Sequence, residues 1–132
     1  MKNVHRYLPW ILVFIAFFWL GWRYYKKEAN KKMVEENYFF AVGKISNYGY
    51  RGTYRNYYLT YSFKVGDELY SKLTSIPYKL FPDCEYDFSI CSDKEFWIAY
   101  EIGNPSNSLI NLDIEIQGIE DPVPPKNLDG FR

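Results

Sequence analysis

Hydrophobic positions follow two different patterns along this chain of 132 residues. Between Tyr7 and Trp22 an apolar run contains no charged residue, and its large side chains cover every face of a helix. From Tyr38 onward, apolar and polar residues alternate in short stretches that are separated by turn residues, which is typical of β-strands. The pattern predicts one apolar N-terminal helix followed by an all-β domain.

The apolar run predicts a transmembrane helix over residues 7–25. A helix of this length rises by about 28 Å, close to the roughly 30 Å thickness of a bilayer's hydrocarbon core. Trp and Tyr residues stand at both ends of the run, as they do at membrane surfaces. One alternative is a helix buried in a soluble core, but the segment is apolar all round. The other is a cleaved signal peptide, but the residues after Phe18 do not form a small-x-small cleavage site. We expect an uncleaved anchor, with residues 1–6 as a short tail before it and a helix over residues 26–37 after it.

Basic residues concentrate around the apolar run. Residues 1–36 carry seven Lys and Arg against three acidic residues, whereas the rest of the chain carries nine against thirteen. More basic residues follow the run than precede it, and this bias predicts that the β domain lies in the cytoplasm. Export is the alternative, because signal anchors also begin with a short basic tail. The basic residues expected to contact the lipid bilayer through its anionic headgroups are Arg23, Lys26, Lys27, Lys31 and Lys32.

Alternation predicts about six strands in the β domain, which we place at residues 38–116. The expected strands are residues 39–47, 57–65, Glu68–Ile76, 84–91, 96–102 and 110–116. Gly66-Asp67 is typical of a tight hairpin turn, whereas residues 48–52 and 103–108 are expected to form loops. Short strands with tight turns predict a small antiparallel sheet or a partly open barrel of the SH3 or OB type. Residues 117–132 are rich in proline and are expected to form an extended or disordered tail.

Cys84 and Cys91 are the only cysteines of the chain. In one continuous strand their odd separation places them on opposite faces, so that a disulfide would require a turn between them. We therefore expect two buried free thiols, with a bridge as the alternative.

Residues suited to catalysis are scarce in the predicted β domain. The single histidine, His5, precedes the apolar run, so we expect no histidine-based catalytic or metal site in the domain. The sequence contains no phosphate-binding glycine loop and no C-x-x-C pair. It therefore predicts neither an enzyme nor a cofactor-binding or metal-binding protein.

Tyrosine and arginine are interleaved around one predicted turn. Both residue types are enriched at the hot spots of protein interfaces, and aromatic rings on OB-like sheets also stack on bases. As a binding site, the set favours another protein over a nucleic acid, because the acidic second half of the domain opposes a polyanion. The simplest interpretation gives the set no binding role: a hairpin whose tyrosines are divided between the core and a membrane surface, in a chain that is 21% aromatic. The candidate contact residues are Tyr48, Tyr50, Arg51, Tyr54, Arg55 and Tyr58.

Three features together carry a family resemblance: the apolar run, the aromatic strand that contains Tyr61 and Phe63, and a Y-x-x-x-N-P-x-x-S segment at residues 100–108. Over residues 40–112 the chain resembles a family of small bacterial membrane proteins, common in Bacteroidetes, that carry a β-rich domain. That family has no established activity, so the resemblance implies an anchor in the bacterial inner membrane and no chemistry.

Taken together, these patterns predict a non-enzymatic single-pass membrane protein whose β domain contacts another protein or an envelope component. A membrane-tethered module associated with nucleic acid or the ribosome is the alternative.

Overall fold

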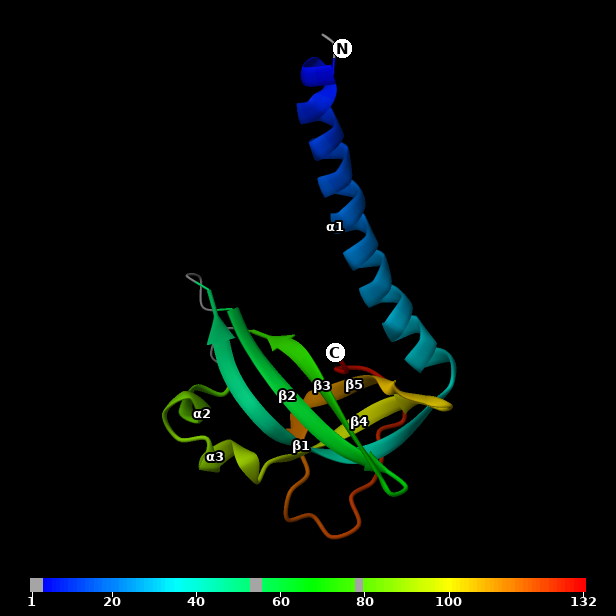
Figure 1. Cartoon of the computed structure of the whole chain (residues 1–132). Coiled ribbons are helices and arrows are strands. Elements are labelled where there is room, and N and C mark those ends of the chain that lie inside the picture. Colours follow the sequence, from blue (N-terminus) through cyan, green and yellow to red (C-terminus); the bar gives the residue numbers. More distant parts are fainter. Residues whose placement is uncertain (1–3, 53–55, 78–79) are drawn as a thin grey trace.

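The computed structural model describes residues 4–52, 56–77 and 80–132. A long helix stands on an antiparallel sheet that curls into half a barrel (Figure 1). The elements are α1 (Val4–Glu36), β1 (Tyr38–Arg51), β2 (Asn56–Val65), β3 (Glu68–Ile76), α2 (Pro82–Tyr86), α3 (Ser89–Ser92), β4 (Glu95–Glu101) and β5 (Asn104–Glu115). The prediction of a mostly β domain behind an apolar helix is confirmed, and the described residues form five strands in place of the expected six.

α1 is one uninterrupted helix of 33 residues. It begins at Val4, so residues 4–6 are helical rather than part of the predicted tail. Its segment from Tyr7 onward is long and apolar enough to cross a bilayer by length and composition, and the apolar window is not buried inside the structure. The predicted helices over residues 7–25 and 26–37 are therefore one element, which ends at Glu36.

The strands lie in the order β3-β2-β1-β4-β5, with every neighbouring pair antiparallel. β3 has the predicted bounds, and the turn before it has Gly66 at a φ of 62°, which glycine adopts without strain. β1 extends to Arg51, because residues 48–51 pair with β2 instead of forming the predicted loop. β5 begins at Asn104, because the Asn-Pro segment pairs with β4 directly after the turn at Gly103. In both cases the sequence predicted a loop where the strand continues, so the predicted strand was too short.

The concave face of the half-barrel holds the main core. Its largest fully buried side chains include Tyr57, Tyr61, Phe96 and Ile98. One aromatic ring, that of Phe63, stacks within 6.2 Å of three tyrosine rings in this core. The alternation of aromatic and polar residues along β2 explains this core, because every second side chain points to the same face.

β1 crosses the core at Gly43, where the side chain of Ile98 on β4 and the backbone of Ser62 on β2 leave no space for a side chain. A Cβ at this position would lie 2.6 Å from Cγ1 of Ile98, closer than real Cβ atoms come. The glycine therefore permits the close approach of a buried isoleucine to the central strand, rather than supplying a turn.

A second, smaller core joins α1 to the convex face. Val34 of α1 is fully buried there, with Trp97, Leu109 and Phe131. Two backbone hydrogen bonds of 3.0 Å hold the end of the chain against β5. The N–H of Ile110 donates to the carbonyl oxygen of Arg132, and the N–H of Arg132 donates to the carbonyl oxygen of Ile110. The prediction of an extended or disordered tail over residues 117–132 is wrong for its last residues, because Phe131 pairs with Asn111 of β5 and is buried in this core.

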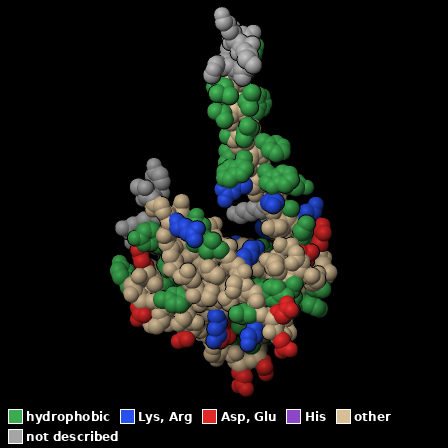
Figure 2. Space-filling model, viewed as in Figure 1, with side chains coloured by type: hydrophobic (Ala, Val, Ile, Leu, Met, Phe, Trp, Pro, Cys, Tyr) green, Lys and Arg blue, Asp and Glu red, His purple; other side chains and the backbone are tan. Residues whose placement is uncertain are grey.

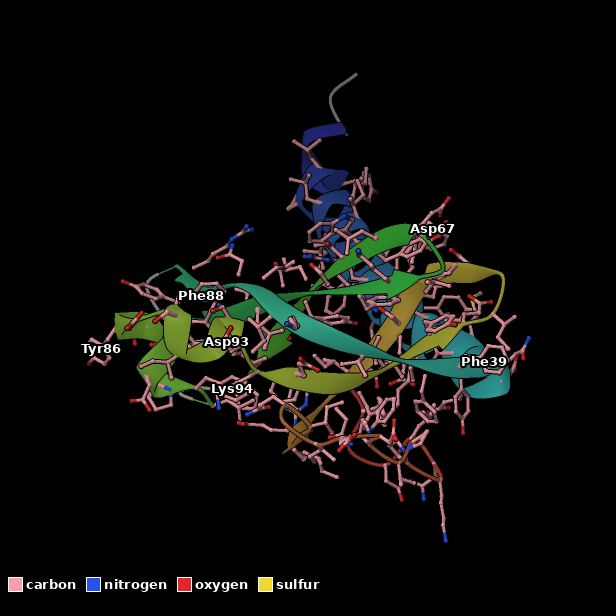
Figure 3. All side chains as sticks on the ribbon, turned by 90° about the horizontal axis from the view of Figure 1, so that it is seen from below. Phe39, Asp67, Tyr86, Phe88, Asp93 and Lys94 are labelled. Atoms are coloured by element: carbon pink, nitrogen blue, oxygen red, sulfur yellow. A yellow bond between two sulfur atoms is a disulfide. The ribbon has the colours of Figure 1, made fainter. Side chains whose placement is uncertain are left out.

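Residues 84–91 form the two short helices α2 and α3 rather than the predicted strand. The helices cover one end of the sheet, where Tyr86 and Phe88 lie in Figure 3, opposite the end that carries Phe39. Pro82 stands at the start of α2, and the carboxylate of Asp87 accepts hydrogen bonds from the backbone and side chain of Ser89 between the helices. These are helix-start signals that the apolar-polar alternation had concealed.

The two cysteines are joined in a disulfide, so the expectation of free thiols is wrong. Because the chain turns between α2 and α3, the Cα atoms of Cys84 and Cys91 come within 5.6 Å of each other, and both side chains are buried against the main core. The turn that a bridge required is therefore present.

Candidate functional site

The predicted Tyr/Arg contact set is divided between the two faces of the sheet. Tyr48 and Tyr50 lie on the concave side, where their rings are 5.9 and 5.8 Å from that of Tyr57. Arg51 and Tyr58 lie on the convex side, with the guanidinium carbon 5.8 Å from the tyrosine ring. Tyr54 and Arg55 fall outside the described residues. Among the described residues of the set, Tyr48 and Tyr50 therefore share one face of the sheet, and Arg51 and Tyr58 share the other.

A small polar cluster lies where the concave tyrosines meet α2. The hydroxyl of Tyr57 donates a hydrogen bond of 3.3 Å to the carboxylate of Glu85. The hydroxyl of Tyr48 is buried and has no hydrogen-bond partner among the described residues. Burial, and after it the nearby Tyr57 and Glu85, raises the pKa of Tyr48, so its hydroxyl stays protonated at neutral pH. Among the described residues, the cluster consists of one carboxylate and the hydroxyls of two tyrosines.

The predicted membrane-surface residues lie along α1. The guanidinium of Arg23 lies 4.8 Å from the ring centre of Trp19, and the ammonium of Lys26 lies 5.9 Å from that of Trp22. Lys31 and Lys32 are exposed on the last turns before the β domain, whereas the side chain of Lys27 is outside the described part of the structure. Cation-π contacts therefore hold two basic groups against tryptophans at the end of the apolar segment. Figure 2 shows blue side chains gathered where α1 meets the domain.

The half-barrel has a seam between its edge strands, β3 and β5. The hydroxyls of Tyr61 and Ser108 are hydrogen-bonded across the interior at 2.9 Å, and both residues are fully buried. The ammonium of Lys72 on β3 donates a hydrogen bond to the carbonyl oxygen of Ser108 on β5. Burial raises the pKa of Tyr61 and lowers that of Lys72. Side chains, rather than a ladder of backbone hydrogen bonds, therefore hold this part of the seam.

A cleft of about 650 Å³ opens between α1 and the seam. We call it the helix cleft. Figure 2 shows the hollow between the helix and the domain. Its walls come from α1, from residues 72–75 of β3 and from the last two residues of the chain, beside β5. The lining residues are Glu28, Asn30, Lys31, Tyr58, Lys72, Leu73, Thr74, Ser75, Leu109, Phe131 and Arg132.

A second surface lies at the opposite end of the domain, beside the loop that follows β5 (Figure 1). A shallow cavity of about 190 Å³ there has the buried side chains of Trp97 and Ile116 among its walls. Ile114, Ile119 and Val123 stand around it and expose 54%, 53% and 85% of their surface. We call these five residues, with Pro122 and Pro125, the distal patch.

No family model, curated protein or solved structure matches this chain. The resemblance to a bacterial family therefore stays a prediction from the sequence motifs. Within the described residues, no group of three or more His, Cys, Asp and Glu side chains is arranged to hold a metal ion.

Sequence reasoning missed both the helix cleft and the distal patch. The cleft depends on how far the sheet curls, which no local pattern specifies. The distal patch had a signal, because Ile114 lies in a predicted strand, and Ile119 and Val123 are large apolar residues in a tail that was expected to be extended or disordered. Their position on one surface can be seen only once the tail is known to fold back against the domain.

Proposed function

We propose that this chain is a non-enzymatic, single-pass protein of the bacterial inner membrane, whose β domain binds another protein through the distal patch. The supporting observation is the cluster of exposed aliphatic side chains at the end of the domain away from α1. Exposed apolar clusters of this kind mark interaction sites on soluble domains.

The position of the patch favours a protein partner over the lipid bilayer. If α1 spans the membrane, the bilayer lies beyond the other end of the domain, and the patch faces the aqueous compartment (Figure 1). Lipid would not cover it there. Each aliphatic side chain that a partner covers completely would contribute about 1.5 to 3 kcal/mol before the cost of association.

Photo-crosslinking in cells tests this proposal. A benzoylphenylalanine placed at Val123 should crosslink the full-length chain to a discrete partner protein. Ile119→Asp should abolish that product, because it places a charge within the patch. Leu69→Asp is the matched control, since Leu69 on β3 is similarly exposed, at 64%, but lies outside the patch. A product that both substitutions leave unchanged would contradict the proposal.

The Tyr/Arg set stays a prediction as a second contact. Arg51 and Tyr58 share the convex face and could still act together, whereas Tyr48 and Tyr50 belong to the other face. This division weakens the alternative of a nucleic-acid-binding or ribosome-associated module, because stacking platforms present their rings on one surface. Arg51→Ala combined with Tyr58→Ala, in the same crosslinking assay, measures whether the pair contributes.

Two observations bear on the compartment of the β domain, and they oppose each other. The basic residues after the apolar segment favour the cytoplasm. The bridge between Cys84 and Cys91 favours export, because disulfides persist in oxidising compartments and are rare in the cytoplasm. C-terminal fusions to alkaline phosphatase and to green fluorescent protein distinguish the two, since each reporter is active on one side of the membrane.

A further inference from the structure

The helix cleft has an excess of positive charge. Three basic side chains line it, those of Lys31, Lys72 and Arg132, against one acidic side chain, that of Glu28. The guanidinium of Arg132 already faces a carboxylate oxygen of Asp113 at 3.6 Å. Among the described residues, neither lysine takes part in a salt bridge. Each wall, α1 and β3, therefore contributes one ammonium group that has no carboxylate partner among the described residues.

Lys72 is the more unusual of the two lysines. Its side chain is half-buried at the seam, and its described hydrogen-bond partner is a neutral carbonyl oxygen, that of Ser108. A partly buried ammonium whose described partner is a neutral carbonyl oxygen loses hydration without gaining a counter-charge from the described residues. Burial correspondingly lowers the pKa of Lys72. An anion in the cleft would supply the missing counter-charge.

Hydrogen-bond donors lie beside the two lysines. Thr74 and Ser75 of β3 and Asn30 of α1 also line the cleft. Ammonium, hydroxyl and amide donors around a single hollow are suited to the several oxygens of a phosphate group. A carboxylate offers fewer acceptor oxygens to such a set.

The position of the cleft along α1 points to the source of that phosphate. Lys31 follows Tyr25 by six residues, which is about 9 Å along a helix, and lipid headgroups extend roughly 5 to 8 Å beyond the hydrocarbon core. A lysine side chain easily covers the difference, so the mouth of the cleft would lie at headgroup depth.

We propose that the helix cleft binds the phosphate of an anionic lipid headgroup, with Lys31 and Lys72 as its charged ligands. The lipid source rests on the proposed membrane span, whereas binding at the cleft is independent of the distal patch. Such a site would hold the β domain against the bilayer surface in one orientation.

Native mass spectrometry of the full-length chain in nonionic detergent tests the site, with short-chain phosphatidylglycerol as the probe. Removing one lysine should weaken lipid binding about fivefold, the ratio expected for one charge near a membrane surface. Lys31→Gln changes an exposed side chain, and Lys72→Met keeps the length of a half-buried one. Lys64→Gln is the matched control, because Lys64 is exposed on β2 and does not line the cleft.

The proposal is supported if both cleft substitutions weaken phosphatidylglycerol binding and Lys64→Gln does not. It is overturned if Lys31→Gln and Lys72→Met bind the lipid as the unmodified chain does, or if all three lysine substitutions weaken binding equally. Competition by millimolar inorganic phosphate that fully displaces the lipid would also overturn it, in favour of a site for a free anion. None of these results depends on the crosslinking at Val123, so the two proposals fail separately.

Discussion

Replacing Gly43 by alanine tests how closely β1 packs against the main core. The added Cβ would lie 2.6 Å from Cγ1 of Ile98, 2.9 Å from its Cδ1 and 3.1 Å from the carbonyl oxygen of Ser62. Carbon atoms in contact prefer about 3.5 to 4.0 Å, so the isoleucine or the strand must move by about 1 Å. Ile98 is fully buried, and its displacement therefore disturbs its neighbours.

Overpacking of a core costs about 1 to 3 kcal/mol. Alanine also restricts the unfolded chain, which returns about 0.4 to 1 kcal/mol. We therefore expect Gly43→Ala to lower the free energy of unfolding by about 1 to 2 kcal/mol. Gly49→Ala, in the same strand, is the matched control, because a Cβ there meets no heavy atom within 4 Å. It should leave the free energy of unfolding unchanged or slightly raised.

Denaturant unfolding of the full-length chain in detergent micelles measures this difference. With Trp10, Trp19 and Trp22 replaced by phenylalanine, the buried Trp97 alone reports unfolding of the β domain. A double-mutant cycle with Ile98→Ala adds a second check, since the cost of Gly43→Ala should largely disappear once the isoleucine is shortened.

Equal midpoints for Gly43→Ala and Gly49→Ala would refute the packing argument. So would a cost for Gly43→Ala that stays the same in the Ile98→Ala background.

Two further predictions concern buried polar and covalent links. Tyr61→Phe should destabilise the domain by about 1 to 3 kcal/mol, because it leaves the buried hydroxyl of Ser108 without this partner; Tyr70→Phe, which removes an exposed hydrogen bond, should change the melting temperature little. Replacing Cys84 and Cys91 by serine should cost about 2 to 3 kcal/mol where the bridge is formed. Thiol alkylation in cells should agree with the reporter fusions, with blocked cysteines in an exported domain and reactive ones in a cytoplasmic domain; disagreement would contradict the assignment of the bridge to an oxidising compartment.

Local patterns predicted the hairpin of β2 and β3 accurately. Its strands alternate over their whole length, and the turn at Gly66 follows a known sequence preference, so no distant contact was needed to define either. The same reasoning failed at residues 84–91, where alternation over a short stretch is compatible with two helical turns. A disulfide and contacts with the main core decide between the two structures there.

The candidate sites were less predictable because each combines distant parts of the chain. The helix cleft joins Lys31 to Lys72 and Arg132, which meet only after the sheet curls and the chain end returns to β5. The Tyr/Arg set was found by proximity in sequence, yet neighbouring residues of a strand point to opposite faces. Sequence adjacency therefore grouped side chains that β1 and β2 separate.

The burial of Val34 means that α1 enters the folded domain without a flexible linker. Any rotation of the helix about its axis is therefore passed directly to the β domain. One residue inserted into α1 between the apolar segment and Val34 would rotate the domain by about 100° about the helix axis, relative to the apolar segment. Seven inserted residues would nearly restore the original orientation. The direction in which the distal patch points is thus set by the phase of a single helix.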